Sequence, residues 1–223
     1  MTLRQWITRV RRPAPLRIFR RTSPLSAVWG FDRGTPVDRY YVRTFLKENR
    51  RDIAGRVLEV ADSEYTIMYG TGVTQADVLD INPSNKLATL VADLTVADRI
   101  PSAAFDCFIL TQTLQFIFDI ESAIANAYRL LRPGGVLLAT VPSVSRIAPE
   151  EPADYWRLTV PSCTRLFAKS FGGENISVTS YGNVMTCVAF LQGMAYGELS
   201  RSELAKKDDA FPLIIGVRAV KAG

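Results

Sequence analysis

The sequence contains no histidine. This absence excludes a Ser-His-Asp triad, a His-based zinc protease site and an imidazole proton shuttle. Any acid or base must therefore be Asp, Glu, Tyr, Lys or Cys. Cysteine is also scarce, because Cys107, Cys163 and Cys187 are widely separated and form no CxxC pair. This pattern indicates buried thiols rather than a disulfide framework or a metal site.

Long apolar runs are missing as well. No segment approaches the ~18 residues that a membrane-spanning helix needs, and the first residues lack the apolar core of a signal peptide. We therefore predict a cytoplasmic protein. With 223 residues, 48% of them hydrophobic, the chain suits one substantial core but not two ordinary catalytic domains. We expect a basic tail over residues 1–28 and one domain over residues 29–223.

Acidic residues are absent from residues 1–21, which contain seven Arg. The formal net charge of the whole chain is +5, so it falls to −2 without those seven residues. The domain thus lacks the basic face that nucleic acid needs, and we expect no nucleic-acid partner. Apolar residues within the tail follow an i, i+3, i+4, i+7 spacing typical of an amphipathic helix. Residues 1–21 either dock onto the inner membrane face or a protein groove, or form a partly disordered linker.

Seven short, mostly apolar runs alternate with helical or loop segments. They span residues 56–61, 76–81, 87–92, 105–111, 135–141, 176–181 and 213–220. Runs without strict polar alternation are typical of strands covered on both faces, so they predict a mainly parallel sheet flanked by helices. Cap and periodicity signals predict three helices: one that follows the N-cap Thr35 and runs to about Ile53, one that follows the N-cap Asp119 and ends with Arg132 in its last turn, and one over residues 184–199.

Polar residues follow these predicted strands at the edge where a doubly wound sheet binds ligands. Asp80 comes about 20 residues after the first loop, the separation at which a carboxylate accepts hydrogen bonds from the two ribose hydroxyls of a nucleoside. Alternatively, Asp80 caps a turn with Asn82 and Pro83. The other candidates in this crescent are Ala61, Asp62, Ser63, Asp93, Leu94, Thr111, Gln112 and Thr113.

Several segments carry a family resemblance. The runs "VLEVAD", "DVLDIN", "VADL", "FDCFILTQTLQFI" and "AYRLLRPGGVLLATVPS" resemble class I S-adenosylmethionine-dependent methyltransferases of the type 11 group. The segments "WGFDRGTPVDRYYVRTFL" and "DYWRLT" resemble a bacterial subgroup associated with glycosyltransferases of glycan assembly. We therefore expect a Rossmann-like α/β fold, doubly wound, with seven mostly parallel strands and an antiparallel last strand.

The resemblance implies S-adenosyl-L-methionine as cofactor and assigns roles to the crescent. Glu59 and the loop of Ala61, Asp62 and Ser63 would meet its methionine part, and Asp80 its ribose. Asp93 and the Leu94 backbone would meet the adenine, while Thr111, Gln112 and Thr113 would line the floor near the methyl group.

The first loop departs from the family pattern, since Ala61, Ser63 and Tyr65 replace its usual glycines. Residues other than Gly resist a positive φ. Either the loop takes another path, or cofactor binding is weakened or lost. The preceding helix offers a second source of contacts. Arg33 could pair with the cofactor carboxylate, and Tyr40 or Tyr41 could stack or hydrogen-bond; alternatively, these are a surface Arg and two packing tyrosines.

The segment "EEPADYWRLT", residues 150–159, is the candidate acceptor region. In it, Asp154 is the candidate base, Tyr155 and Trp156 could pack on a sugar face, and Arg157 could hold an anionic group. Alternatively, the two aromatic residues fasten the loop to the core, and Arg157 pairs with Asp154.

The function that follows is methyl transfer to oxygen on a saccharide or another small metabolite, without a metal. A methyltransferase-like scaffold without catalysis is the alternative, favoured by the missing glycines. A nicotinamide-dependent oxidoreductase ranks third, because its pyrophosphate depends more stringently on those glycines.

Overall fold

The computed structural model describes residues 22–149 and 153–223. The amphipathic helix predicted within residues 1–21 lies outside the described residues, so its docking role stays a prediction. The boundary expected at residue 28 likewise stays a prediction.

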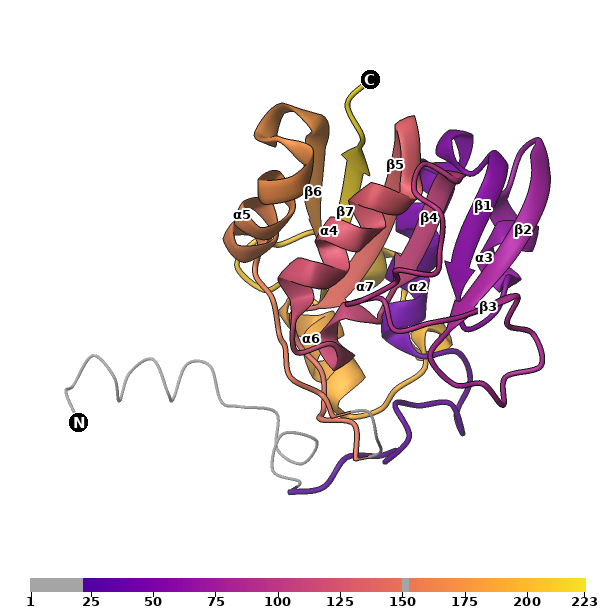
Figure 1. The fold of residues 1–223 in the computed structure, drawn as a ribbon. Coiled ribbons are helices and arrows are strands. Elements are labelled where there is room, and N and C mark those ends of the chain that lie inside the picture. Colours follow the sequence, from indigo (N-terminus) through magenta and orange to yellow (C-terminus); the bar gives the residue numbers. More distant parts are fainter. Residues whose placement is uncertain (1–21, 150–152) are drawn as a thin grey trace, which may run out of the picture.

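A seven-stranded sheet with the order β3-β2-β1-β4-β5-β7-β6 forms the centre of the domain (Figure 1). Neighbours from β3 to β5 pair in parallel, whereas β7 runs antiparallel to both β5 and β6. The strands are β1 (Gly55–Val60), β2 (Val73–Asp80), β3 (Leu90–Val91), β4 (Phe105–Thr111), β5 (Leu131–Pro142), β6 (Ile176–Tyr181) and β7 (Ile214–Val220). The predicted fold class is therefore confirmed, including the antiparallel last strand.

Helices cover both faces of this sheet, as the apolar strand composition requires. On one face, α4 (Ile120–Leu130) and α5 (Val160–Phe171) pack against residues such as Phe108 and Leu110 of β4. On the other, α2 (Val37–Glu48), α6 (Val184–Leu191) and α7 (Arg201–Ala205) share a second core cluster with Cys107 and Ile109 of the same strand. Figure 1 shows these two layers on opposite sides of the sheet. Among the described residues, one further helix is α3 (Glu64–Tyr69), and 3-10 turns occur at η2 (Arg50–Asp52), η3 (Leu114–Phe116), η4 (Gly173–Asn175) and η5 (Tyr196–Glu198).

All three predicted helices differ from the structure at one or both ends. The first begins at Val37 and ends at Glu48, because an isolated bridge between Pro36 and Ala195 keeps the preceding chain extended. The amide of Asn49 donates to the Phe45 carbonyl at the helix end. The helix predicted over residues 184–199 ends at Leu191. Helix α4 begins after Asp119, the predicted N-cap, whose side chain accepts from the Ser122 amide, but it ends at Leu130 because Leu131 and Arg132 already belong to β5.

Helix α5 was not predicted, although its signals are present. Thr159 and Ser162 form a reciprocal capping box, and Pro161 lies in the first turn. Its buried residues, Cys163, Phe167 and Phe171, follow an i, i+4, i+8 spacing. The short helices α3 and α7 carry too few periodic positions for a pattern to reveal them.

The three cysteines are free and buried, as predicted. Over the described ranges, no helix is both long enough and apolar enough to cross a membrane. Within the same ranges, no group of three or more His, Cys, Asp or Glu residues is arranged to hold a metal ion.

Candidate functional site

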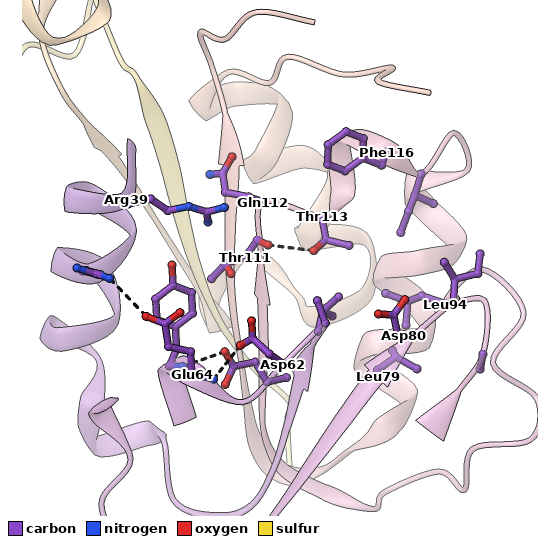
Figure 2. Close-up of a pocket in the computed structure, with 18 of the residues that line it drawn as sticks. Arg39, Asp62, Glu64, Leu79, Asp80, Leu94, Thr111, Gln112, Thr113 and Phe116 are labelled. Atoms are coloured by element: carbon purple, nitrogen blue, oxygen red, sulfur yellow. Dashed lines mark hydrogen bonds and ion pairs between the residues drawn. The ribbon is translucent and has the colours of Figure 1, made fainter. Parts of the chain in front are cut away.

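A cavity of about 620 Å³ opens at the carboxyl ends of β1, β2, β3 and β4, with α2 on its other side (Figure 2). We call it the first cavity. It gathers residues from the four strand ends and from the segment before α2, so it collects chain segments distant in the sequence. Its polar and charged lining residues are Thr35, Arg39, Arg43, Glu59, Asp62, Glu64, Tyr65, Asp80, Asp93, Thr111, Gln112 and Thr113.

The loop after β1 adopts a glycine-like turn although it lacks the glycines of the resembling family. Ala61 adopts φ 72°, so it takes the left-handed conformation that a glycine would adopt without strain. The Ala61 amide donates to the Leu79 carbonyl at 3.0 Å, and its carbonyl accepts from the Asn85 side chain at 2.7 Å. Hydrogen bonds on both sides of this residue hold the strained turn in place.

Glu59 fixes the start of α3. Its side chain is only 2% exposed and accepts from the Tyr65 amide at 3.0 Å, the Thr66 amide at 2.7 Å and the Thr66 hydroxyl at 2.6 Å. These amides have no partner within the first turn of a helix, so the carboxylate satisfies them. Burial raises the pKa of Glu59, and its bonds from Thr66 and Tyr65 oppose that rise.

Asp80 lies at the end of β2 and lines the first cavity. Its Oδ1 accepts from the Asn82 amide at 2.8 Å, and its Oδ2 accepts from the Asn85 side-chain amide at 2.6 Å. The carboxylate therefore caps its turn at Asn82, as the alternative predicted, and also borders the cavity; its contact with a ribose stays a prediction. Asn85, which joins Asp80 to Ala61, was missed by sequence reasoning because its neighbours "NPSN" resemble an ordinary turn.

The opposite wall is formed by residues after β3 and β4. Leu94 is buried, and Asp93 turns its side chain back onto the amide and hydroxyl of Thr95. Thr113 donates its hydroxyl to the Thr111 carbonyl at 2.9 Å, and Gln112 adopts φ 49°. In Figure 2, Thr111, Gln112 and Thr113 lie between Arg39 on one side and Phe116 on the other.

Tyr65 also lines the first cavity, and its ring stacks on Tyr69 with centroids 6.5 Å apart. The ring therefore borders the cavity without filling it. Arg39, a residue the sequence did not single out, projects from α2 toward Gln112 (Figure 2). No carboxylate of the described residues lies within ion-pair distance of Arg39, although its guanidinium interacts with Tyr65 and, at longer range, with Asp38 and Glu64.

Three of the predicted cofactor residues lie outside this lining. Arg33 forms an ion pair with Glu198, with Nε to Oε2 at 3.0 Å. Tyr40 packs against the rings of Tyr41 and Tyr196 at 5.1 and 5.7 Å. Ser63 is the N-cap residue of α3, and its side chain makes no capping bond. The other nine all line the first cavity: Glu59, Ala61, Asp62, Asp80, Asp93, Leu94, Thr111, Gln112 and Thr113.

A second cavity of about 180 Å³ adjoins the first. The two share four lining residues, Phe31, Arg39, Gln112 and Phe116. The second cavity is also lined by the polar residues Asp38, Gln115, Ser145, Asp154 and Arg157, and by the rings of Trp29 and Phe190.

The candidate acceptor residues divide between this cavity and the surface. Asp154 and Arg157 line the second cavity and form a two-pronged ion pair, at 2.5 and 2.7 Å. These bonds, with the Arg157 bond dominant, lower the pKa of Asp154. Asp154 Oδ2 also accepts from the Ala148 amide, and Arg157 donates to the Arg146 carbonyl, so the pair ties the loop together. Tyr155 lies outside both cavities, is 49% exposed, and packs edge-on against Phe118.

Backbone strain gathers around the two cavities. Five described residues other than glycine have positive φ, and three of them, Trp29, Ala61 and Gln112, line the first or second cavity. Strained conformations persist where the surrounding structure enforces them, and they cluster at ligand sites. The backbone strain is thus concentrated around the two cavities at the carboxyl ends of the parallel strands.

Comparison with known proteins finds one matching family model. Residues 47–139, which run from the end of α2 into β5, match the family model described as "Methyltransferase domain". S-adenosylmethionine is the cofactor that this match supports. No curated protein matches the chain by sequence.

Solved structures extend the likeness beyond that segment. A methyltransferase of Mesorhizobium loti, described as dependent on S-adenosylmethionine, has a TM-score of 0.54 and 14% identity; the alignment covers 83% of this chain and 98% of that one. The fold is that of S-adenosylmethionine-dependent methyltransferases. An Archaeoglobus fulgidus methyltransferase of the same description has a TM-score of 0.54 at 11% identity, covering 82% and 94% of the two chains.

A further methyltransferase neighbour is larger. Phosphoethanolamine N-methyltransferase 2 of Haemonchus contortus, in complex with S-adenosyl-L-methionine, has a TM-score of 0.57 and 16% identity. The alignment covers 81% of this chain but 52% of that one. This chain thus corresponds to about half of that methyltransferase.

Proposed function

We propose that this protein binds S-adenosylmethionine in the first cavity and transfers its methyl group to a hydroxyl oxygen of a saccharide or similar small metabolite. The observation that carries the proposal is the position of Asp80. Its carboxylate lies at the end of β2, beside the first cavity. The Asn85 side-chain amide donates both to this carboxylate and to the carbonyl of Ala61 in the strained turn.

The residues present fit this cofactor. The cavity volume of about 620 Å³ falls within the roughly 300–1,000 Å³ typical of small-molecule sites. Leu79, Ile81, Leu94 and Ile117 supply apolar walls for an adenine ring. The Ala61 turn reaches the left-handed conformation without glycine. The departure in the first loop therefore leaves the site open.

We assign each part of the cofactor to residues of the first cavity. The Asp80 carboxylate accepts from the ribose hydroxyls, and Asp93 with the Leu94 backbone meets the adenine. The loop of Ala61 and Asp62 contacts the methionine part. Glu59 fixes the position of this loop through its hydrogen bonds to the start of α3. Thr111, Gln112 and Thr113 form the floor. Arg39 replaces Arg33 as the partner of the cofactor carboxylate, because Arg33 is held by Glu198.

When bound, S-adenosylmethionine supplies an electrophilic methyl group on a sulfonium. The protein contributes alignment and exclusion of water. Phe31 and Phe116 border both cavities, so they can shield the junction from solvent. The backbone amide of Gln112 donates a hydrogen bond to the Thr140 carbonyl at 2.8 Å, so Gln112 forms a rigid part of the same junction.

A scaffold without catalysis is the second candidate. The observation that favours it is Tyr65, which lies in the first turn of α3 at a position where the family that the sequence resembles has glycine, and whose ring borders the first cavity. Such a scaffold would use the methyltransferase fold as a binding surface in glycan assembly. The saccharide acceptor and the glycan setting both rest on the family resemblance.

Isothermal titration with S-adenosylmethionine tests the proposal. The wild-type protein should bind, and Asp80→Ala should lose about 10²–10⁴-fold in affinity, since two hydrogen bonds to a charged group are each worth about 1.5–3 kcal/mol. Asp98→Ala is the matched control, because Asp98 is exposed and outside the first cavity. If the wild type gives no heat of binding, the scaffold without catalysis is the candidate function that remains. Normal binding by Asp80→Ala would refute the ribose assignment.

A further inference from the structure

The second cavity has the size and position of an acceptor site. Its volume of about 180 Å³ is below the roughly 300–1,000 Å³ typical of whole-ligand sites, so it suits the reacting end of a molecule rather than a second cofactor. It meets the first cavity at Arg39 and Gln112. A group held there faces the floor on which we place the methyl group.

Two polar groups of this cavity have no hydrogen-bond partner among residues 22–149 and 153–223. Gln115 is 6% exposed and donates its Nε2 to the Gln112 carbonyl, but its Oε1 accepts no hydrogen bond from the described residues. Arg157 Nε is likewise buried and has no acceptor among them. Buried polar groups are rarely left unpaired. A hydroxyl group bound in the second cavity can complete the hydrogen bonding of these two atoms, as ordered water does elsewhere in proteins.

Asp38 supplies the only described carboxylate of this cavity without an ion-pair partner. It lies in the first turn of α2 and is 9% exposed. One oxygen, Oδ1, accepts from the Arg39 amide at 2.8 Å. Oδ2 accepts no hydrogen bond from another described residue. The other carboxylate, Asp154, is fully engaged with Arg157 and Ala148.

We propose that the second cavity binds the hydroxyl-bearing end of the acceptor, and that the Asp38 carboxylate removes the hydroxyl proton during methyl transfer. This inference rests on the proposed function and moves the role of base from Asp154 to Asp38. It requires an acceptor with at least one O–H to donate to Asp38, and a second donor suits Gln115 Oε1.

The chemistry balances with the groups named. The acceptor oxygen forms a bond to the methyl carbon as the carbon–sulfur bond breaks. The electron pair of the broken bond stays on sulfur. Asp38 takes up the hydroxyl proton and becomes a neutral acid. One positive charge and one negative charge are thereby lost together. The proton then leaves Asp38 for solvent, which restores the carboxylate.

The surroundings of Asp38 suit a base better than those of Asp154. Burial raises the pKa of Asp38, and the Arg39 charge and amide oppose that rise. A base is most effective when its pKa lies near the working pH. The charged groups lining the cavity within the described residues are Arg39 on α2 and the Asp154–Arg157 pair on the loop; β7 and α6 contribute the apolar Ile214 and Phe190.

The test follows the Asp38 carboxyl by carbon-13 NMR in wild-type protein labelled at Asp. Its pKa is compared between complexes with S-adenosylmethionine, which carries the sulfonium charge, and S-adenosylhomocysteine, which does not. If Asp38 faces the transferred methyl, its pKa should be lower in the first complex by at least about one unit, as beside any opposite charge. Asp38→Asn identifies the resonance, and sequential assignment does so if that variant does not fold.

Asp106 is the internal control. It lies at the start of β4, six residues before Gln112 and therefore roughly 20 Å along the strand. The Asp106 carboxyl resonance should be the same in both complexes. Equal Asp38 pKa values in the two complexes would overturn the inference while leaving cofactor binding intact. If S-adenosylmethionine moves no resonance at all, the proposed function fails first, and this inference fails with it.

Turnover gives a second readout, with labelled methyl groups and monosaccharides, sugar phosphates and phenols as acceptors. Asp38→Asn should lower kcat by about 10²–10⁴-fold and abolish the rise of rate with pH, with the KM for S-adenosylmethionine nearly unchanged. Asp106→Asn should leave both unchanged. A variant at Asp38 with full kcat and the wild-type pH profile would contradict the inference.

Discussion

Replacing Ala61 by glycine should stabilise the protein. Ala61 adopts φ 72°, a left-handed conformation that costs a residue with a Cβ about 1–2 kcal/mol. Glycine removes that cost but loses about 0.5–1 kcal/mol more conformational freedom on folding than alanine. The difference is a net gain of about 0.5–1 kcal/mol in the free energy of unfolding for Ala61→Gly.

Thermal and urea unfolding followed by circular dichroism measure this gain. At about 2–4 °C per kcal/mol for a chain of this size, the midpoint temperature should rise by about 1–4 °C. Ala76→Gly is the matched control: Ala76 is exposed within β2 and has no positive φ. It should lower the stability by about 0.5–1 kcal/mol. If Ala61→Gly lowers stability as Ala76→Gly does, the left-handed turn after β1 is refuted.

Three further substitutions separate the roles of the site residues. Arg39→Ala should weaken S-adenosylmethionine binding by about 10–100-fold in titration calorimetry, because it removes one hydrogen-bonded charge; unchanged affinity would exclude it as the carboxylate partner. Glu59→Gln should lower the unfolding free energy in urea by about 1–3 kcal/mol, since an amide group would meet the Thr66 donors; a neutral effect would contradict the anchoring of α3. Asp154→Ala should spare cofactor binding but lower stability by about 1–3 kcal/mol, as Arg157 loses its partner. Because the folded-state pKa of Asp154 is lowered, its stabilisation is present above its unfolded pKa, near 4, and is lost as the pH falls through the folded value; Asp154→Ala should therefore show a shallower acid transition.

Most of the sheet could be predicted because its strands are buried on both faces. The runs at residues 105–111 and 176–181 match β4 and β6 at both ends, and the apolar composition of β4 follows from the two core clusters it contacts. Helix ends set by tertiary contacts were less predictable. The start of α2 depends on pairing between Pro36 and Ala195, which lie far apart in the sequence.

The site residues that follow strand ends could be predicted from the sequence. Residues whose role depends on which distant side chain they contact were less predictable. Asp80 and Thr111 border the first cavity because parallel strands end at one edge. Arg33 and Arg39 both precede β1, and no spacing rule reveals that Glu198, 165 residues later, engages the former. The sequence does not mark Asp38 as a base, because acidic residues are common in the first turn of a helix. Its burial in the second cavity emerges only from packing.

A co-crystal structure with S-adenosylhomocysteine tests the central claim most directly. The account predicts the adenosine in the first cavity, with its ribose hydroxyls donating to the Asp80 carboxylate and its sulfur facing the junction at Gln112. Adenosine bound elsewhere, or a first cavity closed by the Tyr65 ring at saturating ligand, would contradict it.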